Sequence, residues 1–80
     1  MADARTMTLD LLARRAPEAT ICPSEVARAL APDAWRDAMP VVHAAVDRLV
    51  ADDRVRLSWK GRSLAARDGP YRIALTAPAS

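Results

Sequence analysis

A short helix with a well-marked start, predicted at Ser24–Leu30, constrains the fold of this chain more than any other feature. Pro23 biases Cys22, the residue before it, toward extended backbone geometry, and Ser24 is a favoured N-cap residue. The apolar residues of the segment share one side of the helix: Val26, Ala27 and Leu30. Because a helix of two turns is not stable alone in water, the flanking segments must pack against this side.

Apolar residues at helical spacing predict one helix before this element and a longer one after it. The first is expected at about Thr6–Arg15, and Pro17 is expected to end it. The longer helix is expected at Asp37–Asp52, with Asp37 as its N-cap and Pro40 in its first turn, where the missing N–H does no harm. An apolar arc gives this helix one face to bury: Ala38, Val42, Ala45, Val46 and Leu49.

The two ends of the longer helix carry further signals. Ala31–Ala34 is expected to form the turn before it, with Trp35 as a buried anchor near its start. No glycine follows the helix, so the pair Asp52–Asp53 is expected to close it, since aspartate tolerates the left-handed conformation.

The last third of the sequence alternates apolar and polar residues, as half-buried strands do. Strands are expected near Arg54–Trp59 and Tyr71–Leu75 as an antiparallel pair, with Gly61–Pro70 between them as a loop too long for a tight hairpin. A very short strand is expected at Thr20–Cys22. The residues expected to face inward are Val55, Leu57, Trp59, Tyr71, Ile73 and Leu75. Those expected to face outward are Arg54, Arg56, Ser58, Lys60, Arg72, Ala74 and Thr76.

The order helix, short strand, helix, helix and hairpin predicts an α+β fold of the winged helix-turn-helix type. We expect three helices and a C-terminal antiparallel β-wing of two or three strands. The 80 residues are expected to form a single domain, 1–80, with a core at about 6–76 and frayed ends. The predicted core residues are Leu9, Leu12, Ile21, Val26, Leu30, Val42, Val46, Leu49, Val55, Leu57, Ile73 and Leu75.

Several classes of protein are disfavoured by the composition. The sequence has no long apolar run and no apolar signal segment near Met1, so neither a membrane span nor export is expected. Cys22 is its one cysteine, which excludes an intramolecular disulfide and gives no zinc-ligand spacing. A cytoplasmic location is therefore expected.

Several short motifs resemble those of a small bacterial family known only as a domain of unknown function. They are ICPSEVARAL, W-R-x-x-M-P, an alanine-rich helix, V-R-L, K-G-R and G-P-Y-R-I. The resemblance covers roughly Met7 to Leu75 and implies a winged-helix fold, but it implies no activity. His43 departs from the family's pattern, where an arginine would be expected, and Trp59 stands where a polar residue would be expected.

Positive charge is concentrated at the C-terminal end. Residues 1–53 carry six arginines against nine acids, whereas residues 54–80 carry six cations against one acid. This distribution and the helix order favour non-enzymatic binding of DNA or RNA, through the third helix in a major groove and a basic wing on phosphates. The candidate contacts are Arg36, His43 and Arg48 on the helix, Lys60, Arg62 and Arg67 on the wing, and Arg54, Arg56 and Arg72 on the strands. Since Asp47 and alanines share the exposed helix face, we expect the wing to dominate and the affinity to depend strongly on salt.

Two other kinds of function have sequence features to support them. A protein–protein adaptor or homodimer is the alternative, and an exposed apolar patch around Trp35, Met39 and Trp59 would favour it. A reactive pair of Cys22 and His43 is the third possibility, but a free cysteine in a short strand is ordinarily a buried residue. The sequence has no glycine-rich phosphate loop and no metal-ligand cluster, so no enzyme activity, metal or cofactor is expected.

Overall fold

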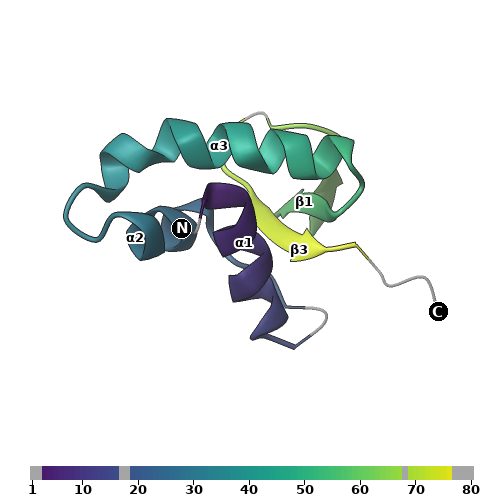
Figure 1. Cartoon of the computed structure of the whole chain (residues 1–80). Helices are drawn as coiled ribbons and strands as arrows, with labels where there is room; N and C mark the ends of the chain where they lie inside the picture. Colours follow the sequence, from purple (N-terminus) through teal and green to yellow (C-terminus); the bar gives the residue numbers. More distant parts are fainter. Residues whose placement is uncertain (1–2, 17–18, 68, 77–80) are drawn as a thin grey trace.

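Three helices are followed by a three-stranded antiparallel sheet in the computed structural model, which describes residues 3–16, 19–67 and 69–76. The elements are α1 (Ala4–Ala13), α2 (Pro23–Leu30), α3 (Trp35–Ala51), β1 (Val55–Trp59), β2 (Arg62–Leu64) and β3 (Arg72–Leu75). The strand order is β2-β1-β3. This α+β layout matches a winged-helix arrangement, as the sequence predicts, and α1 crosses α3 beside the sheet (Figure 1).

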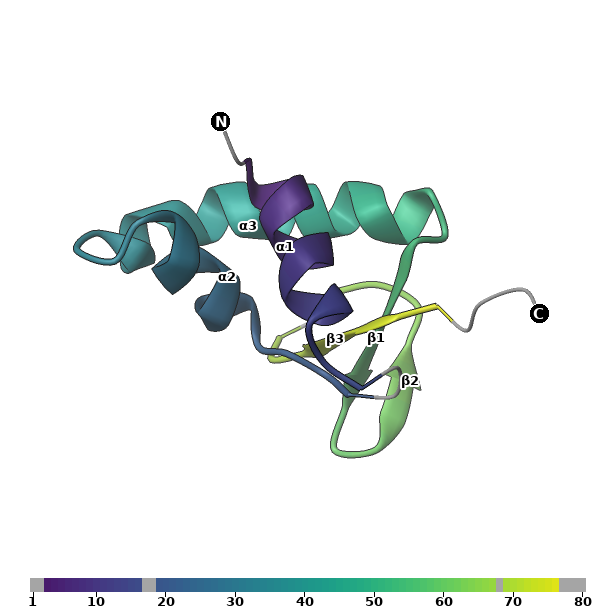
Figure 2. The same cartoon turned by 60° about the horizontal axis from the view of Figure 1, so that its bottom comes forward.

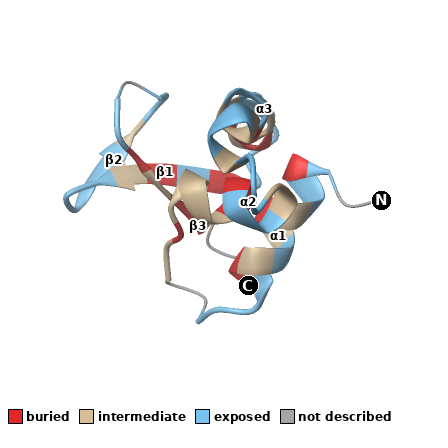
Figure 3. Cartoon of the chain, turned by 90° about the vertical axis from the view of Figure 1, so that its left-hand side faces the viewer, coloured by how far each residue is buried: buried red, intermediate tan, exposed pale blue. Residues whose placement is uncertain are grey.

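The core lies between the helices and one face of the sheet, where the buried residues gather (Figure 3). Of the predicted core residues, all are buried except Leu9, Leu30 and Leu75, which are half-buried and pack against it. The structure adds five buried residues to the predicted set: Ala4, Thr8, Ala27, Tyr71 and Ala74. The hydroxyl of Thr8 donates to the carbonyl of Ala4 at 2.7 Å, so this buried polar group is satisfied within its own helix.

Helix α1 begins two residues before the predicted start and ends two before the predicted end. Asp3 is the N-cap, and its carboxylate accepts a hydrogen bond from the backbone N–H of Thr6 at 2.8 Å. That bond also lowers the pKa of Asp3 below its usual value. Ala4, Thr8 and Leu12, which are spaced four residues apart, share the buried face of α1, and Leu9 is only half-buried. The predicted stop at Pro17 lies outside the described residues.

Helix α2 begins at Pro23, so the predicted N-cap at Ser24 is wrong. Cys22 is the N-cap, with extended backbone angles (φ −86°, ψ 148°) and no side-chain capping bond. Proline has its φ already fixed near the helical value and lacks an N–H that would otherwise be unpaired. The helix therefore starts one residue earlier than the serine pattern suggests.

Helix α3 also starts earlier than predicted, at Trp35 instead of after an Asp37 cap. Ala34 is the N-cap without a side-chain bond, and Asp37 lies in the first turn, where the helix dipole favours its charge. Pro40 consequently lies inside the helix, not in its first turn. It has no N–H to donate to the carbonyl of Arg36 one turn before.

The end of α3 is closed as predicted, by an aspartate in the left-handed region. Asp52 is the C-cap and Asp53 has φ 58°. The N–H of Asp53 bonds the carbonyl of Val50 at 3.0 Å, and that of Arg54 bonds Leu49 at 2.9 Å. These two bonds form a Schellman motif, in which glycine is the usual residue at the left-handed position.

Replacing Asp53 by glycine is expected to raise the free energy of unfolding by about 0.5–1 kcal/mol, because glycine adopts a positive φ without the Cβ clash. Urea unfolding followed by circular dichroism measures the change. Ala51→Gly is the matched control: its position is helical, so the same residue is expected to lower stability by a similar amount. Equal losses in both variants would contradict the assigned backbone conformation.

The strands differ from the prediction at three places. The predicted strand Thr20–Cys22 shrinks to a single bridge, in which Ile21 and Ile73 exchange two backbone hydrogen bonds of 2.9 Å. Both longer strands begin one residue later than predicted. The segment Gly61–Pro70 is not all loop, because β2 pairs with β1 and projects with it away from the helices (Figure 2).

A two-residue turn joins β1 to β2. Lys60 (φ 51°) and Gly61 (φ 80°) both have positive φ, as in the type I′ turns that suit the twist of a hairpin. Lys60 is therefore a turn residue and not the last outward residue of a strand. We call β1, this turn and β2 together the hairpin, residues 55–64.

Candidate functional site

Four cations lie on or beside the hairpin, all exposed: Arg54, Arg56, Lys60 and Arg62. The ion pairs among the described residues involve other arginines, so none of these four is neutralised by a carboxylate described in the structure. Lys60 stands at the tip, and Arg62 follows it on β2. The hairpin thus presents uncompensated positive charge to solvent.

The side chain of Trp59 is more exposed than the sequence predicts. On β1, Trp59 lies on the same side of the sheet as the buried Val55 and Leu57. Its side chain is nevertheless 37% exposed, because the hairpin extends past the core at this end. Trp59 is paired across the hairpin with Arg62, so the two side chains share one face of the sheet. The ammonium of Lys60 lies 6.0 Å from the centroid of the Trp59 ring. An exposed aromatic ring therefore has two cations beside it.

A groove with a volume of about 360 Å³ opens beside Trp59, between the start of α2, the first half of α3 and the segment before β3. It is lined by Cys22, Pro23, Ser24, Met39, His43, Trp59, Gly69, Pro70 and Tyr71. The structure therefore brings together Met39 and Trp59 of the predicted apolar patch. Trp35 is not among the residues that line it.

Two polar side chains of the groove are bonded to each other. The Nδ1 of His43 and the hydroxyl of Tyr71 are 2.7 Å apart, and their rings are tilted at 55°. Burial, followed by the charge of Arg67, lowers the pKa of His43, and burial raises the pKa of Tyr71 to about 12. At pH 7 the tyrosine keeps its proton and the imidazole is neutral. His43 is consequently a polar groove residue and not a surface cation for phosphates.

The lowered pKa of His43 makes stability depend on pH. The unfolded chain, in which the histidine has its ordinary pKa of 6.5, takes up a proton before the folded protein does. The free energy of unfolding is therefore expected to be constant well above that value and to fall as the pH decreases from about 7 toward the folded-state pKa. Urea unfolding at a series of pH values across this window measures the loss.

His43→Gln is the control for this pH dependence, since glutamine keeps a polar group but does not titrate. The variant is expected to show a flat profile in this window. The pKa values of Asp3 and Asp47 are both lowered, by their hydrogen bonds to Thr6 and Arg67, so these carboxylates contribute only at more acidic pH. An unchanged slope in the glutamine variant would assign the effect to another group.

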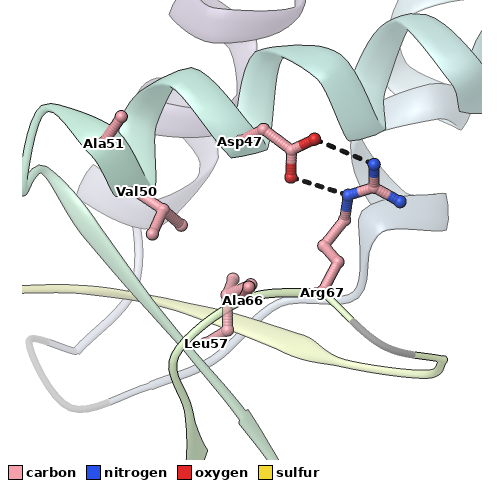
Figure 4. A pocket seen from close by; sticks show the side chains of 6 residues that line it. All are labelled: Asp47, Val50, Ala51, Leu57, Ala66 and Arg67. Atoms are coloured by element: carbon pink, nitrogen blue, oxygen red, sulfur yellow. Dashed lines mark hydrogen bonds and ion pairs between the residues drawn. The ribbon is translucent and has the colours of Figure 1, made fainter.

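Arg67, predicted as a wing contact, is bound to α3 instead. Its Nε and Nη2 donate to the two carboxylate oxygens of Asp47 at 2.7 and 2.8 Å (Figure 4). This bidentate bond lowers the pKa of Asp47 and raises that of Arg67. Together with the bond between His43 and Tyr71, it ties Arg67 and Tyr71 to the α3 face that was predicted to read a major groove.

The other α3 residues predicted to contact nucleic acid, Arg36 and Arg48, lie apart from the bonded pairs His43–Tyr71 and Asp47–Arg67. The guanidinium of Arg36 lies 4.6 Å from the ring centroid of Trp35, and that of Arg28 lies 4.5 Å from the same centroid. Trp35 is half-buried between them, so its expected role as an anchor is only partly met. Arg48 is exposed three turns further along the helix, about 18 Å from Arg36 at 1.5 Å per residue.

Arg72 lies on the outward face of β3, as predicted, but its guanidinium is occupied. It donates to the hydroxyl of Thr20 at 2.6 Å, to the carbonyl of Thr20 at 3.2 Å and to the sulfur of Cys22 at 2.9 Å. Cys22 and His43 line one groove yet are bonded to these different partners. Arg72 is consequently assigned to the structure of the domain and not to the exposed cations.

Two further findings concern the described part of the chain. There, no three histidine, cysteine, aspartate or glutamate side chains come close enough to hold a metal ion. None of the helices described has the length and apolar character needed to cross a membrane.

A family model described as "Protein of unknown function (DUF3253)" matches residues 2–76. No match was found among curated proteins.

Proposed function

The chain belongs to this family of proteins of unknown function, DUF3253, and from that premise we propose that it binds nucleic acid without catalysis, through the hairpin. The observation that carries the proposal is the set of unneutralised cations along the hairpin, in a molecule whose net charge is only +2. Five of the arginines, including Arg67, are instead engaged by acids, hydroxyls or carbonyls of the described chain. Among the other cations, Arg28, Arg36 and Arg48 lie on the helices, and the remaining four lie on or beside the hairpin. Four free cations gathered on one projecting element are suited to phosphates.

The mode of binding follows from which surfaces are open. On α3, His43 is bonded to Tyr71 and Asp47 to Arg67, so the face around them has few donors to offer to base edges. The tip of the hairpin has both Lys60 and Arg62 exposed. Contacts to phosphates fix a protein on nucleic acid without reading its sequence. The proposed binding is therefore of modest affinity, little dependent on sequence and strongly dependent on salt.

A salt titration of binding tests this proposal. The double variant K60A/R62A is expected to bind every sequence more weakly, and the slope of log K against log salt is expected to shrink by roughly 1.4–1.8, which corresponds to two lost phosphate contacts. Fluorescence anisotropy of a labelled oligonucleotide measures both quantities between about 50 and 200 mM salt.

The control R14A/R28A removes the same charge from the C-cap of α1 and from α2, away from the hairpin. It is expected to retain the wild-type slope and nearly the wild-type affinity. Absence of any binding by the wild-type protein at about 50 mM salt, where electrostatic attraction is strong, would overturn the proposal. A loss confined to particular sequences would place the contact surface elsewhere.

One observation supports the alternative of a homodimer or protein adaptor. Val41, on α3, is 60% exposed, and the exposed Pro40 and Ala44 lie beside it in the helix. Apolar residues in such a patch are typical of contact surfaces. Sedimentation equilibrium tests it: the mass of the wild-type protein should rise with concentration, and Val41→Glu should abolish the rise. A wild-type protein that is monomeric at all concentrations would exclude the homodimer.

A further inference from the structure

The groove beside Trp59 is an apolar hollow close to the free cations, and it has a partly exposed aromatic ring in its wall. We infer that the nucleic acid bound is single-stranded, with one unpaired base lying in this groove and stacked on Trp59. The inference rests on the proposed function and names the form of nucleic acid that the same site takes.

The placement of charge around the ring suits this ligand. Arg62 stands directly across the hairpin from Trp59 on the same sheet face, and Lys60 follows Trp59 in the chain, with its ammonium 6.0 Å from the ring centroid. In a nucleotide strand each base is attached to a backbone with a phosphate on either side. A base on Trp59 therefore brings phosphates to the position of these two cations, which is the combination found in single-strand sites.

The remaining walls of the groove match the two kinds of surface on a base. Its faces are apolar, and the groove offers Met39, Pro23 and Pro70 to them. Its edges carry hydrogen-bonding groups, and the groove offers the neutral imidazole of His43 and the hydroxyl of Tyr71. A volume of about 360 Å³ lies within the range of small-ligand sites, which begins near 300 Å³. An apolar pocket with a few polar groups is the usual composition of such a site.

A duplex fits this surface less well. Its bases are stacked within the helix, and a base must be extruded at a cost of a few kcal/mol before it reaches a pocket. On the α3 face that would enter a major groove, His43 and Asp47 are bonded to Tyr71 and Arg67, so they offer few free donors to base edges. A single strand has no such cost, and stacking on an aromatic side chain contributes to its affinity at every sequence.

The full chain with Trp35→Phe, in which Trp59 is the remaining tryptophan, provides the direct measurement. Its fluorescence is expected to be quenched on addition of a twelve-nucleotide oligodeoxythymidylate. The single strand is expected to bind more tightly than a duplex of the same length. Trp59→Ala is expected to weaken single-strand binding about 5- to 150-fold, while its salt slope stays at the wild-type value. Trp59→Phe, which keeps a ring, should retain most of the affinity.

The outcomes separate this inference from the proposed function. If wild-type protein binds neither strand nor duplex, both fail. If K60A/R62A weakens binding but Trp59→Ala does not, or if the duplex binds more tightly, the hairpin function stands and the base site is wrong. The quenching measurement does not depend on the fold of a Trp59 variant, so binding of the strand without quenching overturns the inference by itself. Self-association that protects Trp59 from a neutral quencher, with no effect of oligonucleotide, would assign the groove to a protein partner.

Discussion

Ile73→Ala is expected to lower the free energy of unfolding by about 2–5 kcal/mol, the range for removing a large aliphatic side chain from a core. Ile73 is 0% exposed and lies in β3, where it is paired with Leu57 of β1 and, on the other side, with Ile21. The cavity would open where the sheet and the segment before α2 meet. Domains are typically stable by only 5–15 kcal/mol in total. The variant is therefore expected to unfold at a much lower urea concentration than the wild type, as followed by circular dichroism.

Two controls set the scale for this loss. Ile73→Val removes one methylene from the same site and is expected to cost about 0.5–1.5 kcal/mol. Val41→Ala shortens a side chain that is 60% exposed, so it is expected to change stability by no more than about 0.5 kcal/mol. A loss in Ile73→Ala no larger than that in Ile73→Val would mean that Ile73 is not packed as the structure has it.

The core could be predicted from the sequence because it depends on periodicity alone. Val42, Val46 and Leu49 recur at helical spacing, and Val55 and Leu57 alternate along a strand; all of them are buried. The starts of the helices were less predictable, because several capping residues compete. A start at about Thr6 was predicted for α1, but Asp3 caps the helix, and a proline displaced Ser24 in α2. Such choices depend on small differences in free energy of about 1 kcal/mol, which a pattern of apolar residues does not register.

The strand β2 was missed because its turn lacks the usual residues. A type I′ turn favours asparagine or aspartate at its first central position, and here Lys60 occupies it. Gly61 was the available signal, with Leu64 as an apolar residue three positions later. The prediction therefore included β2 in the loop Gly61–Pro70, whereas the chain already turns back at Lys60 and Gly61.

The sequence indicated the cations of the candidate site but not which of them are free. Arg67 and Asp47 are twenty positions apart, and nothing in their local sequences predicts that they meet. The sheet face of Trp59 was predicted correctly, but its exposure depends on where the sheet extends beyond the core. Pairing and exposure of this kind follow from tertiary packing, so they become visible only in the assembled fold.

Arg72→Ala is expected to lower the free energy of unfolding by about 1–3 kcal/mol, although Arg72 is one of the cations predicted to bind nucleic acid. Its guanidinium connects β3 to Thr20 and Cys22, the segment that leads into α2, through three hydrogen bonds. Removing it leaves the hydroxyl and carbonyl of Thr20 without this partner in a half-buried place. Arg72→Lys is not expected to restore stability, because an ammonium cannot reproduce the planar fork that reaches both residues. Urea unfolding measures both variants.

Arg56→Ala is the matched comparison, since Arg56 lies on the same outward sheet face, opposite Ala74, but is exposed. It carries the same charge and, in the described residues, no ion pair. Arg56→Ala is expected to change stability by no more than about 0.5 kcal/mol but to weaken nucleic-acid binding. Arg72→Ala is expected to do the reverse, with nearly wild-type affinity in the protein that remains folded. The two residues have equal charge and differ chiefly in their hydrogen bonds, so the comparison isolates the effect of those bonds. If the two variants exchanged these effects, the assignment of Arg72 to structure and of Arg56 to binding would be wrong.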